Sequence, residues 1–117
     1  MSDYKYLNAD QMRSHFAGDE EMIGELIEIF EQTYGEILSE VERSLKAKDM
    51  DALEHSAHTL KGMIANLFAK ELIEDAFTLE KMGRDKKVES TGSIIEELKV
   101  GIPELIDEVK AEFKLLD

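Results

Sequence analysis

The chain has 117 residues, of which 27 are acidic and 14 basic, so its formal net charge is −13. This length suits a single domain, residues 1–117, with a real hydrophobic core, and the negative charge argues against binding to nucleic acid or to an anionic membrane. Cysteine is absent, which excludes disulfide scaffolds, thiol catalysis and thiolate zinc sites.

The first ten residues have neither a basic start nor an apolar core, and no apolar run is long enough to cross a membrane. We therefore expect a soluble cytoplasmic protein without membrane insertion. A first short helix is predicted after Asn8 or Ala9; it carries Met12 and Phe16 and ends at Gly18. It is short enough to act as a lid.

A second helix is predicted from about Asp19 to Lys48, with glutamates over most of its polar face. Its apolar residues recur at helical spacing and predict one inward stripe. They are Met22, Ile23, Leu26, Ile29, Phe30, Ile37, Leu38, Val41 and Leu45.

Asp49 is a suitable cap for a third helix, and a fourth is predicted from about Lys70 to Gly83, where Gly83 and the basic turn of residues 84–87 end it. The third helix is expected to bury Leu53, Ala57, Leu60, Ile64 and Leu67. The fourth presents Leu72, Ile73, Ala76, Phe77, Leu79 and Met82.

Helical phase continues across Pro103 in the last segment, which favours one long helix with a kink near Val100, although two separate helices remain possible. Its apolar residues are Ile94, Ile95, Leu98, Ile102, Leu105, Ile106, Val109, Phe113 and Leu116. Together the segments predict an all-α fold: an up-and-down antiparallel four-helix bundle with a short additional N-terminal helix.

The third helix also carries residues suited to chemistry. At about 100° per residue, His58 falls opposite the buried stripe, with Gly62 and Ala65 beside it, Lys61 at one edge and His55 at the other. Neutral imidazole is a nucleophile near physiological pH, and a lysine can neutralise phosphoryl charge. Glycine inside a helix costs about 1 kcal/mol relative to alanine. Gly62 is therefore expected to give another protein access to the imidazole.

His58, Lys61 and Gly62 follow the pattern His-x-x-Lys-Gly, and this segment resembles the signature of histidine-containing phosphotransfer (HPt) domains. The resemblance implies a phosphorelay carrier: His58 is phosphorylated by a receiver-domain phosphoaspartate and passes the group to another receiver. Lys61 would stabilise the phosphoryl charge. The implied partners are response-regulator receiver domains and a hybrid sensor histidine kinase. No cofactor is implied in the chain itself, and Mg²⁺ would be held by the partner receiver.

A further correspondence involves Glu80. Aligned without gaps from His58, Glu80 matches a glutamate that hydrogen-bonds the phosphorylatable imidazole in the HPt domain of chemotaxis-type kinases, which would make it an orienter of His58. A glutamate on a solvated helix face explains it equally well. Family members commonly have small polar residues after the glycine and another glycine near the helix end, whereas this chain has Met63, Ile64 and Phe68, a difference expected to affect partner choice.

His55, Gly62, Ala65 and Phe16 are the residues expected to contact a partner, whereas His15 is expected to be an ordinary surface residue. We expect a monomer without autonomous kinase activity, because the chain has no phosphate-binding glycine loop or kinase signature. A helical interaction module without chemistry is an alternative that leaves Gly62 unexplained. A metal-binding bundle is a weaker one, because no histidine has a glutamate three residues before it.

Overall fold

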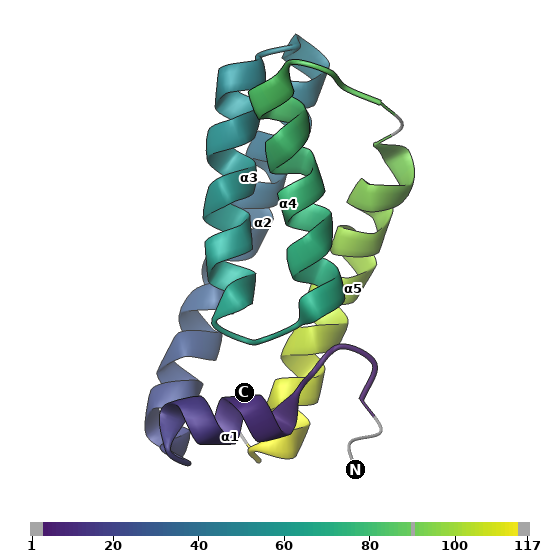
Figure 1. The fold of residues 1–117 in the computed structure, drawn as a ribbon. Coiled ribbons are helices and arrows are strands. Elements are labelled where there is room, and N and C mark those ends of the chain that lie inside the picture. Colours follow the sequence, from purple (N-terminus) through teal and green to yellow (C-terminus); the bar gives the residue numbers. More distant parts are fainter. Residues whose placement is uncertain (1–3, 90, 115–117) are drawn as a thin grey trace.

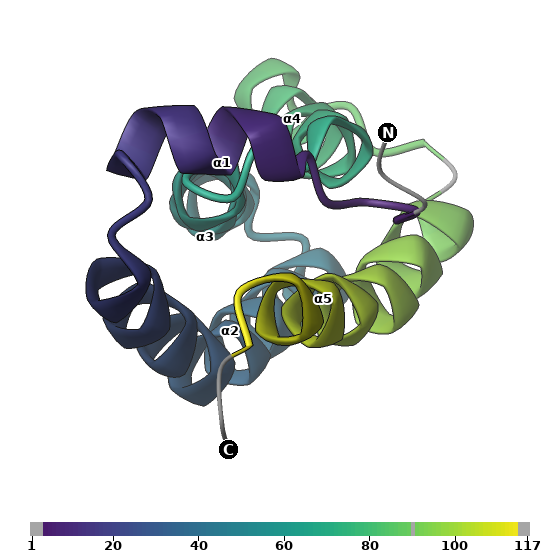
Figure 2. The same ribbon diagram turned by 90° about the horizontal axis from the view of Figure 1, so that it is seen from below.

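Residues 4–89 and 91–114 are described by a computed structural model, in which they form five helices and no strand. Four long helices run alternately up and down, and the short first helix crosses the lower end of the bundle beneath α3 (Figures 1 and 2). The helices are α1 (Ala9–Phe16), α2 (Glu20–Ala47), α3 (Met50–Ala65), α4 (Lys70–Asp85) and α5 (Gly92–Glu112). The predicted all-α bundle with its additional N-terminal helix is confirmed. None of these helices is long and apolar enough to cross a membrane.

Side-chain caps define where three of the helices begin. Asn8, Asp19 and Asp49 each accept a hydrogen bond from the backbone N–H three residues later, at the starts of α1, α2 and α3. Such a cap satisfies one of the backbone donors that a helix start leaves unpaired. At the other ends of α2 and α4, Lys48 and Lys86 take the left-handed conformation that closes a helix.

The core lies between the four long helices and includes the whole predicted stripe of α3. The five residues of that stripe are completely buried: Leu53, Ala57, Leu60, Ile64 and Leu67. Met22, Ile29 and Phe77, which were predicted to face inward, are instead 51%, 58% and 38% exposed. The 28-residue α2 extends below the 16-residue α3, to the end of the bundle where the short α1 crosses (Figure 1). Leu116 lies outside the described residues.

The prediction that Gly83 ends the fourth helix was wrong, because α4 continues to Asp85. Gly83 is buried where α4 meets α3, and a Cβ there would lie 2.6 Å from the backbone nitrogen of Glu54. This glycine therefore allows two helix backbones to approach closely. The last helix is continuous across Pro103, as the prediction of a single long helix required.

The segment before α1 is held to α5 by a buried carboxylate. Glu108 accepts hydrogen bonds from the backbone N–H groups of Lys5, Tyr6 and Leu7, at 2.9, 3.1 and 2.9 Å. Gly101, which precedes Glu108 on α5, is also buried, and a Cβ there would lie 2.7 Å from Leu72 Cδ2. These contacts bring the N-terminal segment and α4 onto α5.

Candidate functional site

The imidazole of His58 projects from the middle of α3 into solvent, with its side chain 66% exposed. Gly62 and Ala65 are also exposed, as helical phase predicted. No heavy atom would lie within 4 Å of a Cβ added at Gly62, leaving aside the backbone of α3 itself. A large partner can therefore approach the imidazole along this surface of α3.

Glu80 on α4 meets the imidazole from the inner side. Its carboxylate is only 5% exposed, and its Oε2 lies 3.1 Å from Nδ1 of His58. The predicted contact between the two residues is thus present. An ionised carboxylate can only accept hydrogen bonds, so Nδ1 must carry the proton. In neutral His58 the lone pair is then on Nε2, the ring nitrogen that remains available for attack.

Lys61 also contacts this carboxylate. Its Nζ lies 2.7 Å from Oε1 of Glu80, so the two residues form an ion pair. The same ammonium lies 4.8 Å from the centre of the Phe77 ring. The exposed Phe77 therefore has a cation as its neighbour on the α3 side, and the charge of Lys61 is directed at Glu80 rather than into open solvent.

Glu80 is ionised despite its burial. Burial alone would raise its pKa, but the polar contacts and charges of Lys61 and His58 outweigh burial and hold the pKa below its usual value. A negative charge consequently lies beside the imidazole at neutral pH. It can stabilise positive charge that develops on the ring when Nε2 forms a bond.

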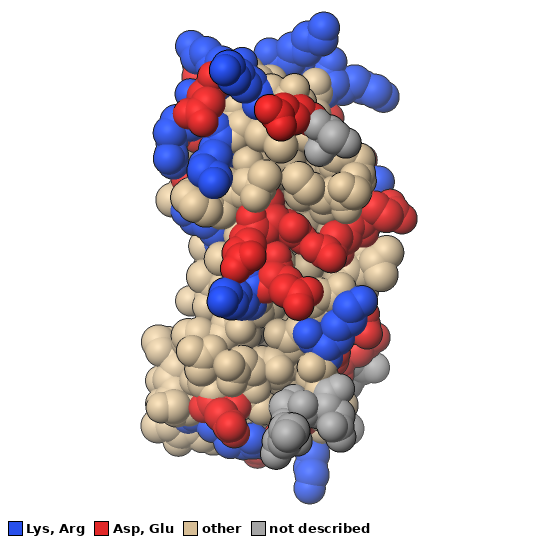
Figure 3. Space-filling view, turned by 45° about the vertical axis from the view of Figure 1, so that its right-hand side comes forward, with Lys and Arg blue, Asp and Glu red and all other residues tan. Residues whose placement is uncertain are grey.

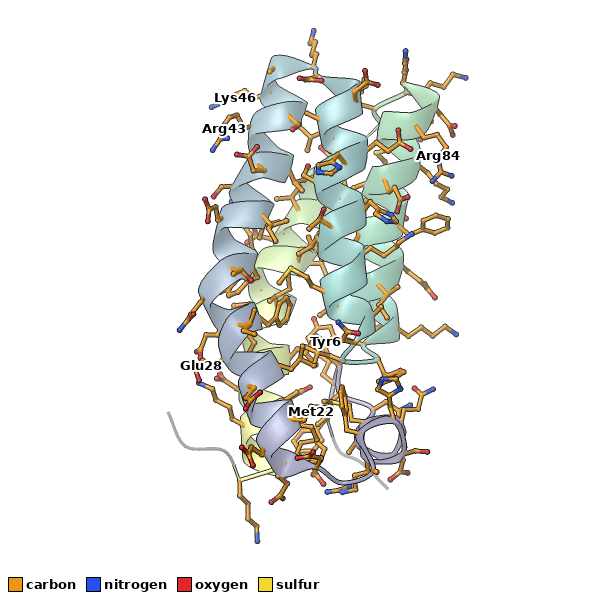
Figure 4. All side chains as sticks on the ribbon, turned by 90° about the vertical axis from the view of Figure 1, so that its left-hand side faces the viewer. Tyr6, Met22, Glu28, Arg43, Lys46 and Arg84 are labelled. Carbon is orange, nitrogen blue, oxygen red and sulfur yellow. The ribbon has the colours of Figure 1, made fainter. Side chains whose placement is uncertain are left out.

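Arg84 joins the same network from α4, where its side chain extends outward from the upper half of the helix (Figure 4). One terminal nitrogen donates to Oε2 of Glu80 at 2.9 Å, and Nε donates to Oε2 of Glu54 at 3.3 Å. Arg84 was predicted to belong to a basic turn beyond the helix, and it lies inside α4 instead. The signal that could have revealed it is its spacing of four residues from Glu80, which places both on one helical face.

The other predicted partner contacts are spread over the surface. His55 is exposed and lines a shallow hollow between α2 and α3 together with Ile37. Phe16 is half-buried at the lower end of the bundle, where its ring contacts His15 at 4.7 Å. His15 is exposed, as predicted, and its ring also contacts Phe68, at 5.3 Å, so it is part of a small aromatic group at the surface.

A separate acidic group lies between α4 and α5, where red side chains gather in the middle of the molecule in Figure 3. Asp75 is its central member. Burial raises the pKa of Asp75 to about 7, and Glu97, Glu71 and Glu74 push it in the same direction. Oδ2 of Asp75 is buried without a hydrogen-bond donor, and a proton shared with Glu97 would supply one. Across the described ranges, no three or more His, Asp or Glu residues are arranged to hold a metal ion.

Two comparisons with known proteins give a match. The model of the Hpt domain family matches residues 25–112, well over half of the chain. The crystal structure of histidine-containing phosphotransfer protein B (HptB) from Pseudomonas aeruginosa PAO1 superposes with a TM-score of 0.82. Its sequence is 24% identical, and the alignment covers 96% of this chain and 97% of that one. No curated protein matches. The chain therefore belongs to the Hpt domain family, whose members are carriers of phosphoryl groups.

Proposed function

We propose that the chain is a phosphorelay intermediate in which Nε2 of His58 accepts a phosphoryl group from a receiver-domain phosphoaspartate and passes it to the aspartate of another receiver. The observation that carries this proposal is that the two ring nitrogens of His58 lie in different environments. Its side chain is 66% exposed, while its Nδ1 is bound to the buried carboxylate of Glu80. A ring held at one nitrogen and open at the other suits repeated transfer to and from large partners.

The transfer of the phosphoryl group needs no base, because no proton has to leave the ring. The lone pair of Nε2 attacks phosphorus, the bond from phosphorus to the aspartyl oxygen breaks, and the aspartate leaves as a carboxylate. The ring keeps its Nδ1 proton and becomes positively charged, and the neighbouring carboxylate of Glu80 stabilises that charge. The reverse sequence regenerates neutral His58 and a phosphoaspartate, which makes the step reversible.

Lys61 is proposed to stabilise the phosphoryl charge. It lies three residues after His58 on α3, hence on a neighbouring part of the helical surface. Its ammonium is already within 2.7 Å of Glu80, so it can serve the phosphoryl group only by sharing or exchanging partners. A flexible lysine is suited to such movement.

The partner is proposed to dock over α3 with Gly62 and Ala65 at the centre of the contact. His55 on one side and Phe16 near the lower end of the bundle would then lie towards the rim, within the span of a standard interface. The donor and acceptor are proposed to be response-regulator receivers and a hybrid sensor histidine kinase in the cytoplasm. Mg²⁺ would be held by the receiver, and the chain itself would act as a monomer.

The proposal is tested with two donors. Phosphoramidate is small and needs no docking surface, and receiver domains charged with radiolabelled phosphate supply the protein partner. We expect acid-labile phosphate on the wild type from both, and none on His58→Gln. His15→Gln, which removes a different exposed histidine, is the control and should be phosphorylated normally. Phosphate that persists on His58→Gln would exclude His58 as the acceptor.

A further inference from the structure

We propose that Arg84 is a positioning residue for phosphotransfer, because it holds Glu80 in the orientation that keeps the proton of His58 on Nδ1. This inference rests on the proposed role of His58 as the acceptor. It adds a functional residue, beyond His58, Lys61 and Glu80, to which the resemblance to the family assigned no role.

The first reason is the arrangement of donors around one carboxylate. Lys61 lies 2.7 Å from Oε1 of Glu80, while His58 and Arg84 share Oε2 at 3.1 and 2.9 Å. The glutamate side chain has three rotatable bonds, and the short contact with Lys61 draws it towards the side of Oε1. Arg84 is the only one of these three donors that belongs to the same helix as Glu80. Because Arg84 binds the same oxygen as His58, it opposes rotation of the carboxylate away from His58.

The second reason is that Arg84 is itself held in place. Its Nε donates to Glu54 at 3.3 Å, and Glu54 lies on α3 one turn before His58. The planar guanidinium thus joins a carboxylate from each helix, a geometry to which arginine is suited and lysine is not. The path from Glu54 through Arg84 and Glu80 leads back to the nucleophile on α3.

The third reason is the neighbouring Gly83. A Cβ at this position would lie 2.6 Å from the nitrogen of Glu54 and 2.8 Å from the carbonyl oxygen of Met50. The backbones of α3 and α4 are therefore in close contact beside Arg84, which lets the guanidinium reach both carboxylates. Gly83 and Arg84 act together, one by bringing the helices close and the other by joining them.

Loss of Arg84 is expected to free Glu80 to turn towards Lys61. The bond to Nδ1 of His58 would then weaken, and the ring would populate the alternative tautomer, in which Nε2 carries the proton and cannot attack. The expected result is a several-fold slower reaction of His58 with phosphoramidate. A faster reaction would overturn the proposal, because it would show that competition between Arg84 and His58 for Oε2 outweighs positioning.

The experiment records the ¹⁵N resonances of the His58 ring at one pH, together with the rate of phosphorylation by phosphoramidate. Arg84→Gln is expected to lose the wild-type pattern with a protonated Nδ1, Arg84→Lys to recover it in part, and Glu54→Gln to give an intermediate effect. Lys81→Gln is the matched control. It removes the same charge from α4, where Lys81 lies 4.8 Å from the Phe77 ring.

A folded Arg84→Gln protein with the wild-type ring spectrum and phosphorylation rate would overturn the proposal, as would equal effects of Arg84→Gln and Lys81→Gln. The tautomer is measured on the unphosphorylated protein. Its outcome is therefore independent of whether His58 accepts a phosphoryl group, which the His58→Gln variant decides separately.

Discussion

Gly62 offers a direct test of whether access to His58 has a cost in stability. In the structure, a Cβ at this position would meet no heavy atom within 4 Å outside the backbone of α3. Gly62→Ala therefore neither gains nor loses packing, and its effect reduces to helix propensity. Alanine is favoured over glycine in a helix interior by about 1 kcal/mol, so the free energy of unfolding should rise by about that amount.

The assay is urea unfolding followed by circular dichroism, with Gly35→Ala as the matched control. Gly35 lies within α2, is exposed, and would likewise have no heavy atom within 4 Å of an added Cβ. Both variants should gain about 1 kcal/mol, which raises Tm by a few degrees for a domain of this size. Only the substitution at Gly62 should slow transfer from a phosphorylated receiver.

Gly62→Gln sharpens the distinction, because glutamine is a good helix former but occupies the space beside His58. Receiver-dependent transfer should fall much more than phosphorylation by phosphoramidate, since only the receiver needs the open surface. If Gly35→Ala were more stable than the wild type but Gly62→Ala were not, the backbone conformation at residue 62 would itself require glycine. Transfer at the wild-type rate in Gly62→Gln would refute the steric argument.

Three further substitutions test the packing and the buried acids. Gly83→Ala should lower the free energy of unfolding by about 1–3 kcal/mol, because the new methyl would clash with the backbone of α3. Glu108→Ala should lower it by about 2 kcal/mol or more, because three backbone N–H groups lose their acceptor, and hydrogen exchange at residues 5–7 should accelerate. The folded protein holds the Asp75 proton up to about pH 7, whereas the unfolded chain releases it near 3.8. Stability should therefore fall as pH rises through that range, and Asp75→Asn should remove this part of the fall.

Each of these three predictions has an outcome that would contradict it. A fully stable Gly83→Ala protein would mean that α3 and α4 can separate without loss, and unchanged exchange at residues 5–7 in Glu108→Ala would mean that the N-terminal segment is held by other contacts. If Asp75→Asn kept the pH dependence of the wild type, the proton would belong to another member of the acidic group between α4 and α5.

Most of the fold could be predicted because helical periodicity is a local property of the chain. The stripe of α3 and the cap at Asp49 needed no knowledge of neighbouring helices. The roles of Gly83 and Phe77, by contrast, depend on the position of a neighbouring helix. A glycine near the end of a helical pattern can terminate the helix or let another backbone approach, and only the position of α3 decides between the two. The exposure of Phe77 likewise depends on where the flank of α3 lies.

The residues of the candidate site also fall into those that helical phase predicts and those that depend on contacts between helices. The exposure of His58, Gly62 and Ala65 follows from their phase on one helix, whereas the contact of His58 with Glu80 joins residues 22 positions apart and was suggested by the family resemblance alone. Arg84 remained hidden because the basic turn of residues 84–87 was predicted to lie beyond the end of the fourth helix, whereas Arg84 lies inside α4. Its actual contacts are set by the closeness of two backbones, which sequence periodicity does not report.

The buried carboxylate of Glu80 links these observations. A buried charge is tolerated only while it is paired, and here Lys61, Arg84 and His58 share that task. If Lys61 turns to an incoming phosphoryl group, Glu80 loses its closest cation at the moment when the His58 ring gains positive charge. Arg84 would keep the carboxylate paired throughout this exchange. The network would then allow one lysine to serve the phosphoryl group without leaving an unpaired charge in the contact between α3 and α4.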